Sequence, residues 1–431
     1  MHVRIYSTLL LLGLAVVSRA QNTASPYSIY GIGTIETSAF NRTSGLGSTG
    51  IAYRSENNLI QNNPASYTDL IQQMFHVEAS ARWQFSNYTG AIFSNNASTN
   101  SGTTGSSQVS NDFTITRISF GTKVTKWWGW SAGIMPYTRV NYNFNSTETL
   151  GSGIPASVTY TGSGGINRAY WGNGFALGKH FSLGFTGSFL FGPLQYEDVT
   201  VASSANADVT SDRNLYLRNV NFDFGGQFYT QFGHNKQWGL TLGATYTPQQ
   251  RLYAEDSLTV LTSATNVINS ALLDRNFLTI PQGYGGGFAI SKASTMKKIT
   301  FTAEARRVLW NSVGLSGTGY SLNNSDRYSA GLEVAKNANI FNTSVEHVYY
   351  QFGGYYQKTY LTLDGSPVLE WGGTLGMGIN PLRYSQWGYV ISLEAGQTSN
   401  YQAGAIRENY FRLNLTIHYW DRWFTRGRKI L

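Results

Sequence analysis

Apolar and polar residues alternate along much of the chain. The clearest example is 75–85, where the odd positions are apolar and the even positions are polar. The same two-residue period recurs at 181–191, 220–228, 238–246 and 411–419. Because successive side chains of a strand point to opposite faces, each segment predicts a strand with one apolar surface. A surface about ten residues long is sufficient to cross a bilayer at a tilt.

Fourteen such segments can be marked. Two of them are irregular: the parity shifts between Ile115 and Ile118, as a β-bulge would require, and the alternation in 339–352 is uneven. The predicted strands are 74–88, 111–125, 130–146, 168–178, 180–192, 217–232, 236–250, 276–292, 297–310, 326–337, 339–352, 367–380, 386–398 and 408–420.

The predicted connections alternate between short and long. Outer-membrane barrels join strands by short turns on the periplasmic side and by longer loops outside. We therefore expect an even number of strands, with both termini in the periplasm. The short connections are near 126–129, 178–180, 233–235, 293–296, 337–338 and 381–385, and the long ones are 89–110, 147–167, 193–216, 251–275, 311–325, 353–366 and 399–407.

The first twenty residues have the pattern of a secretory signal peptide. His2 and Arg4 precede an apolar run of nine residues, 9–17, and a small-x-small cleavage pattern ends at Ala20. An uncleaved anchor is the alternative, but it would need roughly 20 apolar residues. We expect the mature chain to begin at Gln21. It contains no cysteine, which excludes disulfides, thiolate metal sites and a lipid-attachment cysteine.

Composition favours a membrane barrel over a soluble protein. Charged residues make up 13% of the chain, against about 25% in ordinary soluble domains, while aromatic residues reach 14%. No later segment offers 18 consecutive apolar residues, so the pattern excludes helical membrane spans. Interfacial aromatic belts would place tryptophans at strand ends. Seven flank the predicted short turns or the C-terminus (Trp127, Trp128, Trp130, Trp238, Trp387, Trp420 and Trp423), and four lie toward the long loops (Trp83, Trp171, Trp310 and Trp371).

The fold class that follows is all-β, a transmembrane antiparallel barrel of about fourteen strands. We expect a signal peptide at 1–20, an N-terminal plug at 21–72, the barrel at 73–425 and a basic periplasmic tail at 426–431. A secreted β-sandwich or lectin is the alternative. A sandwich or lectin gives no reason for the tryptophans to lie at the two ends of the predicted strands.

A glycine motif precedes the first strand. Gly45, Gly47 and Gly50 have the G-x-G-x-x-G spacing of a dinucleotide-binding loop. Such a loop must follow a strand and open a helix within a βαβ unit, and neither context is present here. The motif belongs instead to a fifty-residue segment that ends with Asn63-Pro64-Ala65. A barrel of fourteen strands has a wide lumen, and we expect this segment to fill it.

These residues resemble a known family. The pattern Ser44-Gly45-Leu46-Gly47 followed by Gly50 and Asn63-Pro64-Ala65 is similar to the N-terminal hatch of FadL/TodX-type outer-membrane transporters of long-chain fatty acids and hydrophobic compounds. The basic extension after the last strand departs from the family, so the chain resembles a divergent member. The resemblance implies passive uptake of apolar molecules through a plugged lumen, with a sideways exit where the third strand is kinked.

Pro136 is the candidate for that exit. It lies within the third predicted strand, and proline cannot donate a ladder hydrogen bond, so it belongs at an edge or a bulge. A proline near a strand end, without an opening, is the alternative. Pro281 in the eighth strand is a weaker case of the same kind.

Charged residues on the polar strand faces should line the lumen. We expect them to pair with one another or with the plug, since buried charges are usually paired. Arg82 and Arg412 come from the first and last strands and could face the plug together. The lumen contacts that we single out are Glu78, Arg82, Glu304, Arg306 and Arg412.

Catalysis, cofactors and nucleic-acid binding find no support in the sequence. There is no G-x-S-x-G elbow and no cluster with metal-ligand spacing, so we predict no enzyme, no catalytic residue, no metal and no cofactor. The lysines near the short turns solvate the rim in this interpretation.

Two functions remain open. The first is a monomeric Gram-negative outer-membrane barrel that takes up hydrophobic small molecules in contact with outer-membrane lipid. The second is a non-transporting accessory subunit of a secretion or barrel-assembly complex of the envelope.

Overall fold

The computed structural model describes residues 25–37, 40–90, 107–149, 155–202, 208–262, 266–273, 278–313, 316–317, 319–340, 343–380, 386–402 and 404–422. The expected signal peptide and basic tail lie outside these residues. Within them, no helix has the length and apolarity that a membrane-spanning helix needs.

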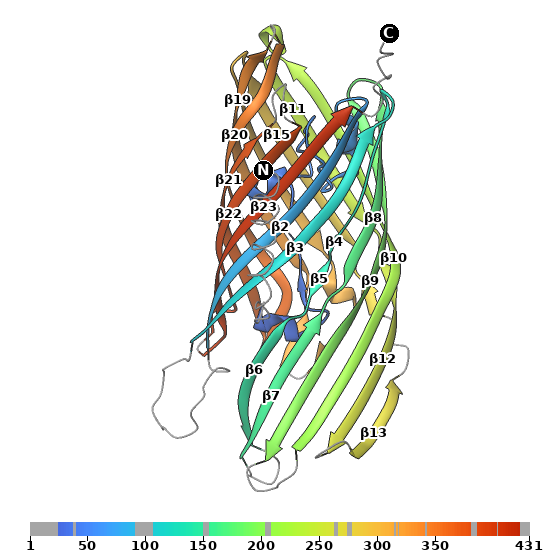
Figure 1. Cartoon of the computed structure of the whole chain (residues 1–431), viewed down its shortest axis with the longest axis vertical. Coiled ribbons are helices and arrows are strands. Elements are labelled where there is room, and N and C mark those ends of the chain that lie inside the picture. Colours follow the sequence, from blue (N-terminus) through green and yellow to red (C-terminus); the bar gives the residue numbers. More distant parts are fainter. Residues whose placement is uncertain are drawn as a thin grey trace, which may run out of the picture.

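The chain forms a closed antiparallel barrel of fourteen strands, as the alternation predicts (Figure 1). The barrel closes where β2 (Met74–Thr89) pairs with β23 (Arg407–Arg422) in a continuous ladder. The predicted bulge is confirmed, because Ser80 and Ala81 of β2 face Arg117 and Ile115, which leaves Thr116 without a partner on that ladder. The other uninterrupted wall strands are β3 (Ser107–Lys123), β9 (Phe181–Ala202), β10 (Asp208–Phe232), β20 (Thr343–Leu363), β21 (Ser366–Ile379) and β22 (Trp387–Ser399).

The remaining wall strands are interrupted by breaks and bends. Each consists of two or three consecutive pieces. The pieces of one strand occupy one position in the wall, except Thr138–Arg139, which pair with Thr34–Ile35 inside the barrel instead. These pieces are β4 (Trp128–Pro136), β5 (Thr138–Arg139) and β6 (Tyr142–Thr149); β7 (Pro155–Gly164) and β8 (Asn167–Leu177); β11 (Trp238–Thr247) and β12 (Gln250–Thr262); β13 (Asn266–Leu273), β14 (Leu278–Ile280) and β15 (Gly283–Ala293); β16 (Lys297–Val308) and β17 (Ser316–Gly317); and β18 (Tyr320–Leu322) and β19 (Ser325–Ile340).

Four predicted long loops are largely strand. The expectation of a loop at 353–366 is wrong, because β20 continues to Leu363. The expectation of loops at 147–167, 193–216 and 251–275 is also wrong, because β6 and β7, β9 and β10, and β12 and β13 continue there as paired strands. On this side the sheet extends well beyond the rest of the barrel (Figure 1). β10 has 25 residues, whereas about 9–11 suffice for a membrane strand. Serine, threonine and asparagine are typical of loops, but in these segments they also suit a strand that faces water.

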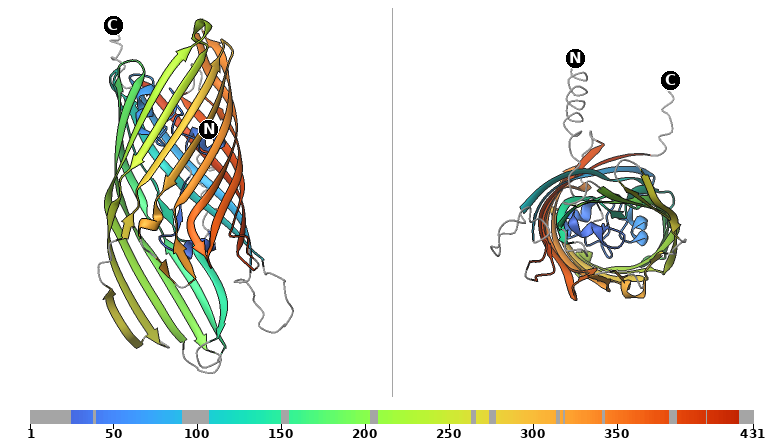
Figure 2. Two further views of the ribbon diagram at one scale, coloured as in Figure 1. Left: turned by 180° about the vertical axis from the view of Figure 1, so that it is seen from behind. Right: turned by 90° about the horizontal axis from the view of Figure 1, so that it is seen from below.

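The segment before the barrel lies inside it. Seen along the barrel, residues 25–37 and 40–71, which we call the inner segment, occupy the lumen (Figure 2). The segment contains a short strand and three short 3-10 helices, and most of its residues are buried. Its elements are η2 (Pro26–Ile29), β1 (Thr34–Ile35), η3 (Arg42–Leu46) and η4 (Pro64–Asp69); two further 3-10 helices, η6 (His234–Lys236) and η7 (Trp310–Val313), connect wall strands.

The two ends of the lumen differ in polarity. Around η3 and η4 the wall presents buried polar and charged side chains, whereas around η2 and β1 it presents an apolar core. Trp310 belongs to that core: it is 1% exposed and its ring lies 4.8 Å from the ring of Tyr360. Its predicted place in a lipid-facing aromatic belt is therefore wrong. Trp83, Trp171 and Trp371 are exposed on the outer wall.

Candidate functional site

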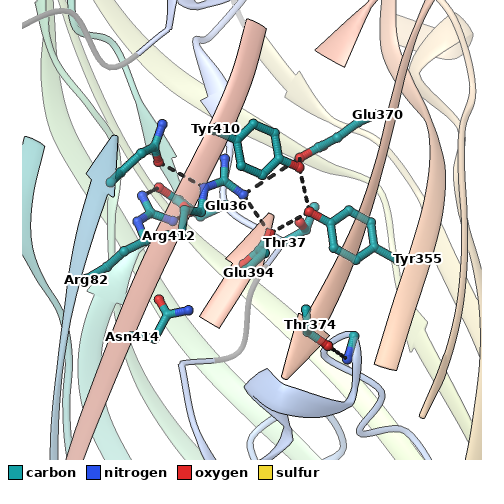
Figure 3. Close-up of polar contacts among 12 residues, drawn as sticks. Glu36, Thr37, Arg82, Tyr355, Glu370, Thr374, Glu394, Tyr410, Arg412 and Asn414 are labelled. Atoms are coloured by element: carbon teal, nitrogen blue, oxygen red, sulfur yellow. Dashed lines mark hydrogen bonds and ion pairs between the residues drawn. The ribbon is translucent and has the colours of Figure 1, made fainter. Parts of the chain in front are cut away.

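The glycine motif forms a turn that packs against the wall. Asn41 begins η3, with its side chain accepting a hydrogen bond from the Thr43 amide, and Gly47 ends it with a φ of 66°. A Cβ on Gly47 would lie 2.6 Å from the carbonyl oxygen of Gly354, so only glycine fits. The hydroxyl of Thr374 accepts from the Gly47 amide at 2.8 Å and donates to the Gly45 carbonyl at 2.9 Å (Figure 3). These glycines allow close packing, and the amides of Gly47 and Gly50 donate to wall side chains, Thr374 and Glu304.

Asn63, Pro64 and Ala65 form the start of η4. The Asn63 side chain accepts from the Ala65 amide at 3.1 Å and donates to the Ile51 carbonyl at 2.8 Å. It also donates to the Gly226 carbonyl of β10 at 3.1 Å, which joins the turn to the wall. Nearby wall glycines leave room for it: a Cβ on Gly225 would lie 2.1 Å from the Asn63 oxygen.

Arg42 is the most enclosed cation of the inner segment. Its Nη2 lies 2.9 Å from a Glu333 carboxylate oxygen, and its guanidinium also pairs with Glu346. The ring of Tyr349 stacks 3.8 Å from the guanidinium carbon, and Tyr53 donates a hydrogen bond to Glu333 at 2.8 Å. Burial alone would lower the pKa of Arg42, but the two carboxylates raise it well above its ordinary value. Arg42 therefore stays charged and bridges β19 and β20.

Two of the predicted lumen carboxylates bind the inner segment. Glu78 accepts from the Leu59 amide at 2.8 Å and pairs with Arg117. Glu304 accepts from the amides of Gly50 and Ile51 at 2.7 and 2.9 Å. Each carboxylate thus satisfies backbone donors that no secondary structure pairs.

Arg306 and Arg82 have different roles. Arg306 donates to Glu304 of its own strand at 2.9 Å. Arg82 reaches the inner segment, where it donates two hydrogen bonds to Glu36 at 2.6 and 2.8 Å (Figure 3). Burial by itself would raise the pKa of Glu36, but the guanidinium of Arg82, helped by Arg139, lowers it to about 2.

Arg412 pairs within the wall beside Arg82. Its guanidinium donates to Glu394 at 2.9 Å and to Gln84 at 2.9 Å. Glu394 also accepts from Tyr355, whose hydroxyl contacts that of Tyr410 (Figure 3). The structure therefore brings Arg82 and Arg412 into one polar cluster, in which Arg82 is the one that holds the inner segment.

Several site residues were not predicted from the sequence. Arg117 lies within the predicted bulge between Ile115 and Ile118, where the alternation does not assign a side chain to one face. Arg42 and Glu36 lie in a segment without periodicity, where no pattern assigns a partner. Arg139 was missed although it follows the predicted kink; it pairs with Asp112 at 3.0 Å.

The best-defined cavities of the lumen are small. One of about 70 Å³ borders Arg82, Arg139 and Arg412, and one of about 150 Å³ borders Pro64 and Arg168. A third, of about 240 Å³, borders Pro136 and is lined by both apolar and charged side chains. Pockets for drug-sized ligands usually measure about 300–1,000 Å³.

The wall has an incomplete ladder beside Pro136. β3 pairs with β4 only where Ile118–Lys123 face Gly129–Ile134, and among the described residues the rest of β3 pairs with β2 alone. After Pro136 the chain bends inward, and β5 pairs with β1 of the inner segment. Pro136 thus lies at a strand edge, which tolerates its missing amide donor. Pro281 lies between β14 and β15, outside the ladder pairs.

No metal site is evident in the described part of the chain, where no three histidine, aspartate or glutamate side chains are grouped to hold an ion.

Comparison with known proteins identifies the family. A family model described as BamG matches residues 1–430. The chain belongs to the BamG family. No curated protein sequence matches it.

Solved channel structures share the fold of this BamG family member. A FadL homologue of Pseudomonas aeruginosa aligns with a TM-score of 0.55 at 10% identity, covering 91% of this chain and 100% of that one. The toluene transporter TodX of P. putida gives 0.53 at 12% identity, covering 92% and 99%. The toluene transporter TbuX of Ralstonia pickettii gives 0.51 at 12% identity, covering 89% and 98%. The closed barrel and this likeness support an outer-membrane location.

Proposed function

We propose that this protein is an accessory subunit of an outer-membrane complex that assembles or secretes proteins, and that it does not transport small molecules. The observation that carries this proposal is the filled lumen. Arg42, Glu78 and Glu304 tie the inner segment to opposite parts of the wall, and the cavity nearest Asn63–Ala65 holds only about 150 Å³. The name of the BamG family also suggests a place in an envelope complex.

In this proposal residues 21–72 are a permanent hatch rather than a gate. Opening it would expose the charged partners of several buried ion pairs, and removing one partner of such a pair costs about 3–5 kcal/mol. The hatch motif Gly45, Gly47, Gly50 and Asn63–Ala65 then serves to dock the segment. The end with the short turns, and both termini, face the periplasm, as the asymmetry of the connections favours.

The extended sheet supplies a surface for a partner. β9 and β10 continue beyond the apolar part of the wall, which ends near Phe191 and Val220. Beyond this level the outward side chains include exposed polar residues, such as Gln195 and Glu197, together with exposed apolar ones, such as Val201 and Tyr216. A rigid sheet outside the membrane costs little ordering entropy when a second protein binds. The role requires no catalytic residue and no cofactor.

Passive uptake of hydrophobic molecules is the second candidate. The incomplete ladder beside Pro136 favours it, because a gap there would let an apolar molecule leave sideways. The cavity of about 240 Å³ at Pro136 also borders Trp310 and Tyr137, which would suit an apolar ligand. Hydrocarbon channels share the fold. Under this candidate the hatch would have to move to create a path.

The deciding experiment is purification of the tagged protein from native membranes in mild detergent, followed by mass spectrometry of proteins and lipids. A stoichiometric envelope protein, reduced in yield by Glu197→Arg but not by Pro136→Thr, would support the accessory role. Recovery of the chain alone, with toluene or hexadecanoate uptake that depends on Pro136, would refute it and favour transport.

A further inference from the structure

Lysines gather at the barrel end that carries the short turns. Of the ten lysines in the sequence, Lys358 lies toward the other end and Lys429 lies outside the described residues. Every ion pair within 4.0 Å between described residues uses an arginine and none uses a lysine. Ion pairs therefore do not occupy the described lysines, although Lys123 donates a hydrogen bond to the Thr68 carbonyl. The lysines of this end are Lys123, Lys126, Lys179, Lys236, Lys292, Lys297, Lys298 and Lys336.

Three of them lie together on the outer face. Lys292 is the penultimate residue of β15, Lys297 begins β16 and Lys336 lies near the end of β19. These strands are neighbours in the wall. All three side chains are exposed. Lys297 and Lys336 are direct cross-strand partners. Like charges in this arrangement repel one another unless an anion lies between them.

No described carboxylate supplies that anion. Glu333 and Glu346, the acidic residues of β19 and β20 that are nearest in the chain, point into the barrel and bind Arg42. These two carboxylates are thus engaged with the inner segment, and none of the ion pairs within 4.0 Å between described residues includes the three outward lysines.

Aromatic side chains fix the level of the lysines in the membrane. The Lys292 ammonium lies 5.1 Å from the ring centroid of Trp238, its cross-strand partner, and the Lys336 ammonium lies 5.7 Å from that of Tyr350. Tryptophan and tyrosine prefer the headgroup region of a bilayer. The ammonium groups are therefore at the depth of lipid phosphates, and they point sideways from the wall.

We propose that Lys292, Lys297 and Lys336 bind the headgroup of an anionic phospholipid, with its phosphate held between Lys297 and Lys336. The proposal rests on the orientation given under the proposed function, which puts this end in the phospholipid leaflet. A periplasmic protein would have to reach past the headgroups to contact the same side chains. Each basic residue near an anionic membrane surface contributes about 1 kcal/mol of binding, or roughly a fivefold change in affinity.

The test uses the full protein purified in detergent and incubated with phosphatidylglycerol or phosphatidylcholine of identical chains. Native mass spectrometry then counts the lipids retained. We compare Lys297→Gln/Lys336→Gln with the control Lys126→Gln/Lys179→Gln, which removes two exposed lysines of the same end elsewhere on the rim. Circular dichroism checks that each variant is folded. A salt titration of the unaltered protein gives a measurement that needs no variant.

The unaltered protein and the control should retain phosphatidylglycerol in preference to phosphatidylcholine, and raising the salt should weaken that preference. The Lys297/Lys336 variant should bind phosphatidylglycerol about tenfold to thirtyfold more weakly. Equal loss in both variants, unchanged retention, or tighter retention of lipid A phosphates than of phosphatidylglycerol would overturn the proposal. The proposal would also be overturned if the Lys297/Lys336 variant kept its lipid but lost an envelope protein in the native-membrane purification. Because the lipid measurement needs no partner, its failure is distinguishable from failure of the accessory role.

Discussion

Arg42 of the inner segment and Glu333 of β19 face each other inside the barrel, with Nη2 2.9 Å from Oε1 and side chains that are 3% and 2% exposed. The contact joins residues 291 positions apart. It shows how the inner segment is held: by charge pairs that water does not reach, formed with strands far along the chain.

Replacing Arg42 by alanine should therefore destabilise the protein strongly. The change leaves Glu333 and Glu346 buried without their cation, which costs about 3–5 kcal/mol of unfolding free energy. Urea titration in detergent micelles measures this loss of unfolding free energy. Arg218→Ala is the control, because its pair with Glu255 is 54% and 58% exposed and such pairs contribute about 1 kcal/mol or less. Equal losses in the two variants would contradict the role assigned to Arg42.

Replacing Gly47 and Gly178 by alanine distinguishes the cost of backbone strain from the cost of lost close packing. Both have positive φ, 66° and 69°, but a Cβ on Gly178 meets nothing within 4 Å. Gly178→Ala should cost about 1 kcal/mol from strain alone. Gly47→Ala should cost roughly 1–3 kcal/mol more, because its methyl group meets the Gly354 carbonyl. Urea titration of both variants measures their losses of unfolding free energy. Equal losses would mean that the glycine motif is not packed against β20.

The contact between Glu36 and Arg82 should make the inner segment sensitive to strong acid. The folded pKa of Glu36, about 2, is below its ordinary value of 4.5. A depressed acid pKa stabilises the folded state fully above the ordinary value, and the contribution is lost as pH falls from about 4.5 toward 2. Pulse proteolysis across this range should show increasing cleavage near residue 36. Glu36→Gln should remove that portion of the pH dependence, and an unchanged profile would contradict the assignment.

Trp310 tests the apolar part of the lumen. Trp310→Ala should cost about 3–5 kcal/mol, because it empties a buried site against Tyr360. Trp171→Ala should cost clearly less, since Trp171 is 58% exposed on the outer wall. Urea titration of both variants in the same micelles gives the comparison. A larger loss for Trp171 would restore Trp310 to the aromatic belt that the sequence predicted.

The wall was predictable because its signal is local. The two-residue period at 75–85 depends only on a bilayer outside and polar groups inside, so it identifies β2 without knowledge of its partners. Even the bulge at Thr116 was visible as a change of parity. The extension of β9 and β10 could not be predicted in the same way. Outside the membrane the outward face of a strand meets water instead of lipid, so the alternation of apolar and polar residues weakens.

The contacts of the inner segment could not be predicted, for a different reason. Glu36 and Arg42 lie in a stretch without a repeating pattern, so nothing in the sequence states which wall residues they meet. Arg82 and Glu78 could be recognised as lumen residues from their strand faces. Their partners depend on how the segment folds in a confined space, which is a long-range property.

The ladder between β2 and β23 joins the first wall strand to the last one. Residues synthesised at the outset are thus enclosed by residues synthesised at the finish, and they contact strands throughout the sequence. Contacts of such long separation slow folding. The inner segment can therefore acquire its final surroundings only after the last wall strand has been synthesised.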